Sequence, residues 1–210
     1  ILIGLVGSEM CIRDSLCMVC LCSSLFFLGL YQFNNKYSQN TIQAANGILA
    51  LSEEELQKSP VRFLVSGWAF YPDALLTPEE IQDESHYMRY LSIGEQTNFS
   101  SPANPSPYGC GTYQMTFFLP GRKETYALEI PEVFSAYNLY LDHDLILQMG
   151  EPAQGTPLVQ NRMVTFHGGK PVTLTIAVSN YDHFYGGIVY PPAFGTMLAV
   201  NTCLLYTSDA

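Results

Sequence analysis

Two stretches of the chain alternate apolar and polar side chains residue by residue. They read TYQMTFFL over 112–119 and VTLTIAVS over 172–179. Because successive side chains of a β-strand point to opposite faces, this alternation predicts strands that bury one face in a core. These two stretches are therefore the clearest strands in the sequence.

Seven weaker strand signals accompany them, separated by turn residues. Pairs such as Pro120-Gly121 and Gly168-Gly169 favour tight changes of direction. Many short strands with frequent turns predict an all-β sandwich or barrel. The weaker strands are expected at Val61–Val65, Trp68–Tyr71, Tyr126–Ile130, Ala136–Leu141, Leu145–Gln148, Met163–His167 and Gly187–Tyr190.

Two helix starts are convincing, and both predict short surface helices. One is the run Ser52-Glu53-Glu54-Glu55. In the other, Thr77 can cap the helix, Pro78 suits the first helical position and Glu80 completes a capping box. We expect these helices to decorate the sandwich without forming a layer of it.

A membrane-directed segment precedes the strand-rich region. Residues 15–35 carry no charge, and residues 16–31 (LCMVCLCSSLFFLGLY) are almost wholly apolar. A bilayer is spanned by roughly 17–25 such residues, so residues 16–33 are expected to be a signal-peptide core or a signal-anchor helix. The sequence leaves cleavage open, and in both cases the linker (34–45) and the domain (46–202) are expected to be exported.

Both ends of the chain differ from its middle. The runs 5–14 and 203–210 each resemble a translated sequencing adapter. Residues 1–15 and 203–210 are therefore expected to be non-native, and the native protein is expected to extend beyond both.

The composition of the chain argues against certain classes of partner and cofactor. Nine Lys and Arg against nineteen Asp and Glu give a net charge of −10, which opposes binding to nucleic-acid phosphates. Only Cys110 lies outside the apolar run and the end segments, so no internal disulfide is expected. The spacing of Cys17, Cys20 and Cys22 lacks a fourth metal ligand. We expect no metal and no cofactor.

Several motifs occur in the order found in one receptor family. They are Gly67-Trp68-Ala69-Phe70-Tyr71-Pro72, Leu75-Leu76-Thr77-Pro78, Gly109-Cys110-Gly111-Thr112-Tyr113, Tyr126-Ala127-Leu128, Ser135-Ala136-Tyr137-Asn138-Leu139-Tyr140-Leu141, Val178-Ser179-Asn180 and Gly186-Gly187. With these motifs the chain resembles, over roughly residues 46–197, the extracellular sensor region of bacterial seven-transmembrane receptors with diverse intracellular signalling modules.

The resemblance implies a fold, a cellular place and a function. The fold is a galactose-binding-like jelly-roll β-sandwich, similar to the N-terminal sugar-binding domain of family-2 glycoside hydrolases. The function is that of an extracytoplasmic ligand-sensing domain at the cell membrane, in a truncated receptor that continues into membrane helices and a kinase or cyclase output. The ligand expected is a carbohydrate or small polar molecule.

Two alternatives stay open beside the receptor. One is the accessory sugar-binding domain of a secreted family-2-like glycoside hydrolase. The other is a purely structural or protein-binding sandwich that holds receptor subunits together, as in a homodimer. The chain contains no Gly-x-Ser-x-Gly elbow, no His-Glu-x-x-His motif and no phosphate-binding loop with a Lys, so no catalytic role is expected for it.

The main candidate binding site is the segment SNYDHFYGG at 179–187. It follows a strand end and concentrates amide, imidazole, phenol and carboxylate groups, which is typical of ligand sites on scaffolded loops. The alternative is that the Asn ties a turn and the glycines supply positive φ. The candidate ligand-binding residues are Asn180, Asp182, His183, Tyr185, Gly186 and Gly187.

Three further positions carry candidate chemistry. Tyr137 and Tyr140 lie on opposite faces of one strand, and Tyr140 with Asn138 is the pair expected outside, as part of the ligand site. Trp68 could stack on a sugar, but its apolar neighbours favour core packing. Asp142-His143-Asp144 could hold a metal, but a hairpin turn is the expectation.

Overall fold

The apolar run near the N-terminus forms one long helix, α1 (Leu2–Asn34). Its segment Ile12–Tyr31 has a mean hydropathy of 1.7 and is not buried within the protein. Ser23 and Ser24 donate hydrogen bonds to the carbonyl of Cys20, so their hydroxyls are satisfied inside the helix. By length and composition the helix can cross a bilayer, and a signal sequence has the same properties.

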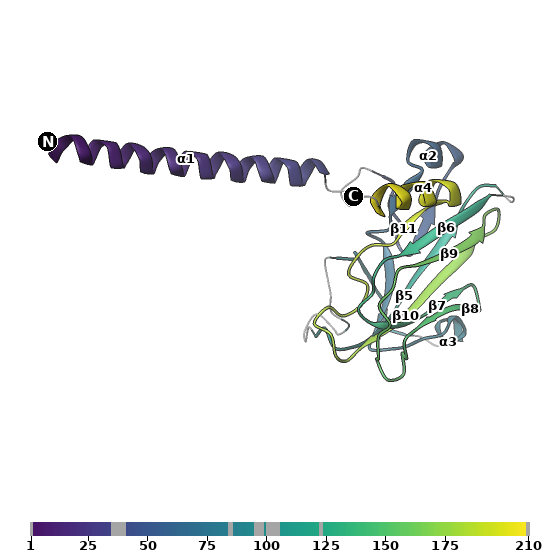
Figure 1. The fold of residues 1–210 in the computed structure, drawn as a ribbon. Helices are drawn as coiled ribbons and strands as arrows, with labels where there is room; N and C mark the ends of the chain where they lie inside the picture. The colour runs from purple at the N-terminus through teal and green to yellow at the C-terminus, as the bar shows by residue number, and fades with distance from the viewer. Residues whose placement is uncertain are drawn as a thin grey trace. The chain divides into compact units, whose positions relative to one another are not determined.

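The computed structural model describes residues 2–34, 41–83, 86–94, 99, 106–121 and 124–208. The chain divides into two compact units, Ile1–Asn40 and Thr41–Ala210. The second unit is built of mostly antiparallel strands in two sheets, with a few short helices (Figure 1). The expected all-β jelly-roll sandwich is therefore confirmed.

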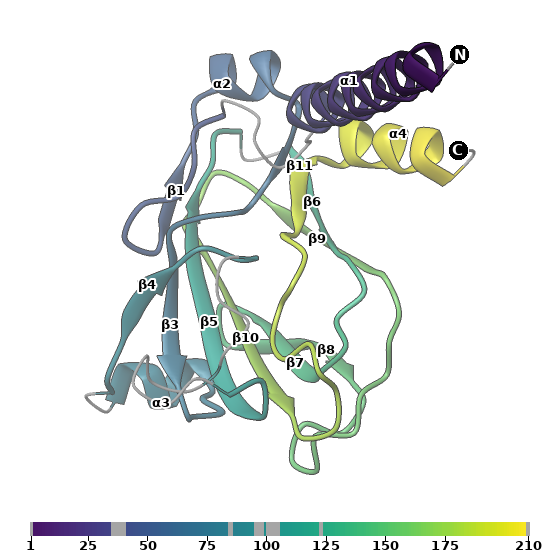
Figure 2. The same cartoon turned by 90° about the vertical axis from the view of Figure 1, so that its left-hand side faces the viewer.

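The larger sheet has seven strands. They are β1 (Ile48–Ala50), β3 (Trp68–Pro72), β4 (Arg89–Leu91), β5 (Gly109–Phe118), β7 (Ala136–Leu141), β8 (Asp144–Met149) and β10 (Val172–Asn180). Their order is β4-β3-β5-β10-β7-β8, and β1 pairs with β5 in parallel. Figure 2 shows β3, β5 and β10 running side by side in its centre.

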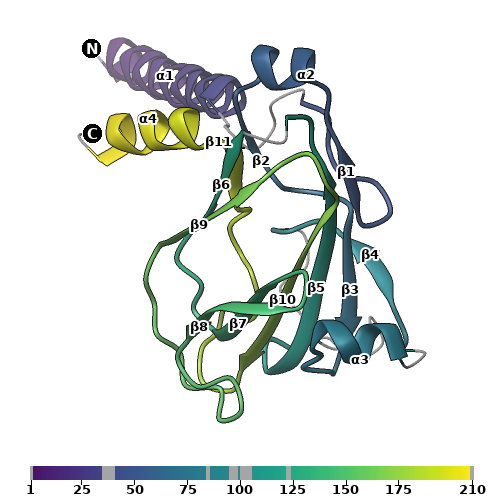
Figure 3. The same cartoon turned by 90° about the vertical axis from the view of Figure 1, so that its right-hand side faces the viewer.

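The smaller sheet has four strands and packs on the larger one. Its strands are β2 (Val61–Phe63), β6 (Thr125–Ile130), β9 (Arg162–His167) and β11 (Ala193–Thr196), in the order β2-β11-β6-β9. A helix, α4 (Met197–Ser208), continues directly from β11 (Figure 3). Its Val200 is buried, so the helix contributes to the core.

Aromatic rings from both sheets meet in the core. The ring of Phe117 on β5 stacks on that of Phe194 on β11, with centroids 5.1 Å apart. Phe194 also stacks on Tyr126 of β6 at 5.7 Å, and Phe166 of β9 packs against both. Because these side chains are almost fully buried, their burial provides a large part of the hydrophobic stabilisation.

Both expected helices form where the capping residues predict them. In α2 (Glu53–Lys58), Ser52 and Glu55 make a reciprocal capping box. In α3 (Pro78–Asp83), the backbone N–H of Thr77 donates to the Glu80 carboxylate at 2.8 Å, and the Glu80 N–H donates back to the Thr77 hydroxyl. Each helix is only six residues long, so the caps supply much of its local order.

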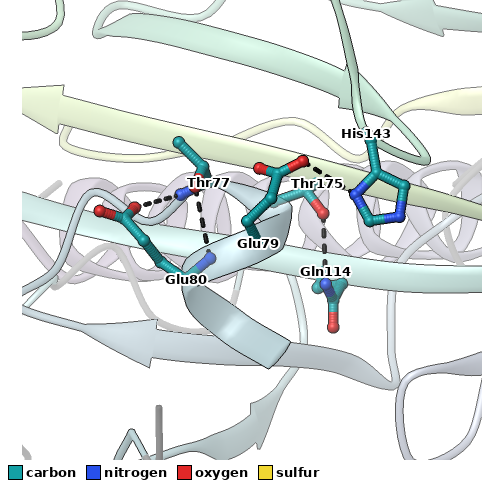
Figure 4. Close-up of polar contacts among 6 residues, drawn as sticks. All are labelled: Thr77, Glu79, Glu80, Gln114, His143 and Thr175. Atoms are coloured by element: carbon teal, nitrogen blue, oxygen red, sulfur yellow. Dashed lines mark hydrogen bonds and ion pairs between the residues drawn. The ribbon is translucent and has the colours of Figure 1, made fainter. Parts of the chain in front are cut away.

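Helix α3 covers part of the outer face of the larger sheet. Thr175 of β10 points away from the core and is nevertheless fully buried. Its hydroxyl accepts a hydrogen bond from Gln114 of β5. Helix α3 contacts the turn between β7 and β8 through Glu79, whose carboxylate lies 2.9 Å from Nδ1 of His143 (Figure 4). The helix therefore reduces the part of this outer face that is exposed to solvent.

The strand expected at Gly187–Tyr190 is absent, and this prediction was wrong. Gly187 has a φ of +80°, and its N–H donates to the Ser135 hydroxyl instead of to a neighbouring strand. Pro191 and Pro192 follow and have no N–H to give to a sheet. The next strand, β11, begins only at Ala193. The sequence analysis predicts neither β11 nor the short strands β1 and β4.

Trp68 is a core residue, so the sugar-stacking alternative for it is wrong. Its side chain is fully buried, and its indole Nε1–H donates to the carbonyl of Leu64 at 2.8 Å. Its ring packs edge-on against Tyr113. The indole is therefore satisfied inside the protein and presents no face to a ligand.

Alkaline pH is expected to destabilise the sandwich through two buried phenols. Burial raises the pKa of Tyr113 and of Tyr137 to about 12, whereas an unfolded tyrosine titrates near pH ~10. The fold holds both phenols neutral, so this contribution is complete below pH ~10 and is lost as the pH rises through the folded-state pKa. The free energy of unfolding, measured against pH, should fall by on the order of 2 kcal/mol per tyrosine.

Two phenylalanine variants separate the contributions. Tyr137→Phe removes a buried hydroxyl without a hydrogen-bond partner, so it should preserve stability at neutral pH and reduce the alkaline loss. Tyr113→Phe removes the acceptor of the Ile188 N–H and should lower stability by about 1 kcal/mol at neutral pH. An alkaline loss of unchanged size in both variants would contradict the prediction.

Candidate functional site

Asn180 closes the end of β10 and holds the loop that follows it. Its side chain is fully buried. Its Oδ1 accepts from the His183 N–H at 3.0 Å, and its Nδ2 donates to the carbonyls of His183 and Pro107 at 2.6 and 2.8 Å. All its hydrogen-bonding groups therefore face the protein, which makes Asn180 the turn residue that the sequence offered as the alternative to a ligand contact.

Gly186 and Gly187 let the loop return close to the protein body. A Cβ atom at Gly186 would lie 2.0 Å from the Pro107 carbonyl oxygen, and one at Gly187 would lie 2.5 Å from the Tyr113 hydroxyl. Both glycines are buried. They serve the close approach of backbone that only glycine permits, and they do not face solvent where a ligand would bind.

His183 and Tyr185 lie over the ring of Phe134. The imidazole stacks on Phe134 with centroids 4.7 Å apart and planes 11° apart, and the Tyr185 ring is tilted against it at 6.0 Å. Nδ1 of His183 accepts a hydrogen bond from the Tyr185 N–H at 3.1 Å. This hydrogen bond and the ring stacking fix the orientation of the imidazole.

The outer surface of this loop exposes large aromatic side chains. Phe184 is 73% exposed and packs edge-on against Tyr185, which is 46% exposed. Asp182, also exposed, places a carboxylate in the same loop. We call the side chains of Phe134, His183, Phe184 and Tyr185 the aromatic ledge. Exposed aromatics on a loop with a fixed backbone are unusual enough to mark a candidate binding surface.

Asn138 and Tyr140 lie elsewhere, on the outer face of the larger sheet. They follow each other on one side of β7, where Nδ2 of Asn138 donates to the Tyr140 hydroxyl at 3.5 Å. Tyr137 faces the core, in keeping with the expected alternation. Among the described residues, the contacts of Asn138 and Tyr140 connect them to each other and not to the aromatic ledge.

The Asp142-His143 turn has structural partners for its side chains. Asp142 has a φ of +55°, accepts from the Thr173 N–H at 2.9 Å and lies near Lys170. His143 pairs with Glu79 of α3. The turn expectation is therefore confirmed. Within the described ranges no group of three His, Cys, Asp or Glu side chains is arranged to hold a metal ion.

Sequence reasoning missed Phe134, which forms the base of the ledge. It precedes Ser135, whose hydroxyl accepts from the Gly187 N–H at 3.1 Å. The two segments are far apart in sequence, and only the pairing of β7 with β10 brings them together. Its one sequence signal is an aromatic residue just before a predicted strand.

Comparisons with known proteins identify the fold. The chain matches no protein-family model, and no curated protein matches it in sequence. A glycosyl hydrolase family 2 member from Bacteroides cellulosilyticus DSM 14838 is 12% identical, with a TM-score of 0.51 over 65% of this chain and 20% of that chain. A second family 2 structure from Bacteroides cellulosilyticus is also 12% identical and has a TM-score of 0.50 over the same shares.

A β-glucuronidase from Faecalibacterium prausnitzii is 17% identical and has a TM-score of 0.47, over 66% of this chain and 32% of that chain. The chain thus spans between a fifth and a third of the length of these proteins. At such identities the likeness concerns the fold alone. The expected likeness to family-2 glycoside hydrolases is confirmed at that level.

Loss of the Asn180 side chain is expected to destabilise the domain. Asn180→Ala removes three hydrogen bonds and leaves buried backbone groups without partners, so the free energy of unfolding should fall by about 2–4 kcal/mol. Asn180→Asp should also be destabilising, because a carboxylate cannot donate to the two carbonyls. Chemical denaturation of the full chain measures both.

Asn161→Ala is the matched control, because Asn161 is exposed and its removal should change stability by no more than about 0.5 kcal/mol. Equal stability of the Asn180 and Asn161 variants would show that the loop is not held by Asn180.

Proposed function

We propose that the sandwich is the extracytoplasmic ligand-sensing domain of a bacterial membrane signalling receptor, and that its ligand is a carbohydrate or another small polar molecule. The observation that carries this proposal is the aromatic ledge, which is solvent-exposed on its outer side and fixed to the protein on its inner side. A surface of this kind is preorganised, so little conformational entropy is lost on binding.

The chemistry of the ledge suits a sugar. Aromatic rings such as Tyr185 and Phe184 cover the apolar C–H face of a pyranose. The carboxylate of Asp182, in the same loop, can accept hydrogen bonds from ring hydroxyls. Small-ligand sites commonly combine apolar surface with a few polar groups in this way. The proposal assigns binding and no catalytic role to this chain.

The membrane part of the proposal rests on α1. Its segment Ile12–Tyr31 matches the length of a bilayer span. If the helix is retained, it anchors the domain at the extracytoplasmic face of the cell membrane. The resemblance of the motifs between Gly67 and Gly187 to receptor sensor regions supports this place for the domain.

Signalling from such a domain requires that the ligand distinguish two states. A ligand that binds both arrangements of a receptor equally tightly shifts no equilibrium, however strong its binding. Two contacts join the loop at 181–187 to the segment before β7: Phe134 stacks on His183, and the Ser135 hydroxyl accepts from the Gly187 N–H. A ligand across both segments would favour the arrangement in which they are closest.

A second candidate function is the accessory sugar-binding domain of a secreted family-2-like glycoside hydrolase. The observation in its favour is the fold shared with glycosyl hydrolase family 2 structures. Both functions predict sugar binding at the domain, and they differ in whether the chain stays in a membrane.

Ligand binding is expected to depend on the ledge. In the full chain, solubilised in a detergent without a sugar headgroup, Tyr185→Ala and His183→Ala should weaken saturable binding in a glycan and metabolite panel by about tenfold or more. The melting temperature should change by only a few degrees, because both side chains lie at the surface. Calorimetry or thermal-shift titration measures the effect.

Tyr87→Ala is the control, since Tyr87 is an exposed tyrosine outside the ledge. A domain that binds nothing in the panel but dimerises with concentration would favour the protein-binding alternative. Collapse of folding in the His183 or Tyr185 variant would mark these residues as structural.

Membrane retention is expected to depend on α1. The full chain, expressed in a bacterium, should stay with the membrane after an alkaline carbonate wash. Replacing both Leu21 and Leu25 by Arg should release it, because a charge at the centre of a span costs about 2.5–3.5 kcal/mol. A shortened chain recovered in the soluble exported fraction would favour cleavage and the secreted-hydrolase alternative.

A further inference from the structure

Tyr181 is a further exposed aromatic residue, in the same loop as His183, Phe184 and Tyr185. It is the first residue after β10, and 48% of it is exposed. Its ring occupies the space that a side chain at position 155 would take, since a Cβ atom on Gly155 would lie 2.1 Å from Cδ2 of Tyr181. The ring is therefore seated against the backbone of the loop 151–156.

The loop beneath Tyr181 is held by several hydrogen bonds. The N–H groups of Gln154 and Gly155 both donate to the Glu151 carbonyl, and the Glu151 N–H donates to the Thr156 carbonyl at 2.9 Å. The buried hydroxyl of Ser179, on β10, donates to the Pro152 carbonyl at 2.6 Å. We call Tyr181 with the loop 151–156 the Tyr181 platform.

The end of β10 thus carries two aromatic surfaces on separate supports. The Tyr181 platform rests on the loop after β8, and the aromatic ledge rests on Phe134, just before β7. Buried Asn180 immediately precedes Tyr181 and accepts a hydrogen bond from the His183 N–H, and the exposed Asp182 lies between Tyr181 and His183 in sequence. Both surfaces are preformed, and each is open to solvent.

We propose that the Tyr181 platform and the aromatic ledge are two subsites of one site, which binds successive rings of a linear oligosaccharide. This inference rests on the proposed function and names its ligand class. An open aromatic surface covers only one face of a sugar ring, so a single ring binds weakly. A second ring linked to the first binds at a high effective concentration, which raises the affinity without new kinds of contact.

The number of sugar rings in the oligosaccharide is the variable that tests the proposal. The full chain, in a detergent without a sugar headgroup, is titrated with linear series from monosaccharide to hexasaccharide built of glucose, galactose or mannose. For the series that binds, the affinity should rise at least about tenfold between the monosaccharide and the short oligosaccharides. Tyr181→Ala should lower the oligosaccharide affinity to that of the monosaccharide, whereas Tyr185→Ala should weaken binding at every length.

A pair of glycine variants separates the ring's position from general strain. Gly155→Ala fills the space of the Tyr181 ring, so it should reproduce the effect of Tyr181→Ala. Gly121→Ala imposes a side chain at a similar φ, +74° against +72°, but meets only Glu124. In the Gly121→Ala variant the affinity should still rise with the length of the oligosaccharide.

Two results overturn the inference and are distinct from each other. If the wild-type chain binds monosaccharide and oligosaccharide equally, or if Tyr181→Ala weakens both by the same factor, the second subsite is wrong and the proposed function stands. If no saccharide of any length binds the wild-type chain, carbohydrate sensing falls together with the subsite.

Discussion

The pairing of β5 with β10 is the constraint on which the rest of the domain depends. Nine consecutive residue pairs run from Val172 opposite Phe117 to Asn180 opposite Gly109. Apolar side chains from both strands point inward and meet the smaller sheet, where Phe117 stacks on Phe194. Every other strand of the larger sheet is added to one side or the other of this pair. A shift of register by one residue would turn the apolar faces outward.

The same register decides where the candidate site lies. It ends at Asn180, whose buried amide makes three hydrogen bonds to the backbone and so holds the loop that follows. The buried residues Asn180, Gly186 and Gly187 support the loop from inside the protein. The residues that face solvent are their neighbours in sequence. A binding loop of this design keeps its recognition groups exposed and its conformational restraints buried.

Coverage of the outer face adds a second restriction. Helix α3 lies over part of the larger sheet. Just before the helix, the Leu76 N–H donates to the Thr112 hydroxyl, and within it Glu79 contacts His143. Thr175 is buried, although it faces away from the core. Asn138 and Tyr140 share this face, apart from the loop at 181–187. The exposed rings of Tyr181, Phe184 and Tyr185 lie in the loop that follows the central strand β10.

Local patterns determined much of this protein. Alternation specified the faces of β5 and β10, because the side-chain period of a strand is two whatever its neighbours are. Capping residues specified α2 and α3, because the hydrogen bonds of a cap lie within four residues of each other. The apolar run specified α1.

Tertiary structure decided the rest. The strands β1, β4 and β11 are three or four residues long and owe their pairing to distant partners. The contacts of Phe134 with His183, and of Tyr181 with Gly155, join segments separated by tens of residues. No local preference records such contacts, because they form only once the sheet has aligned the ends of its strands.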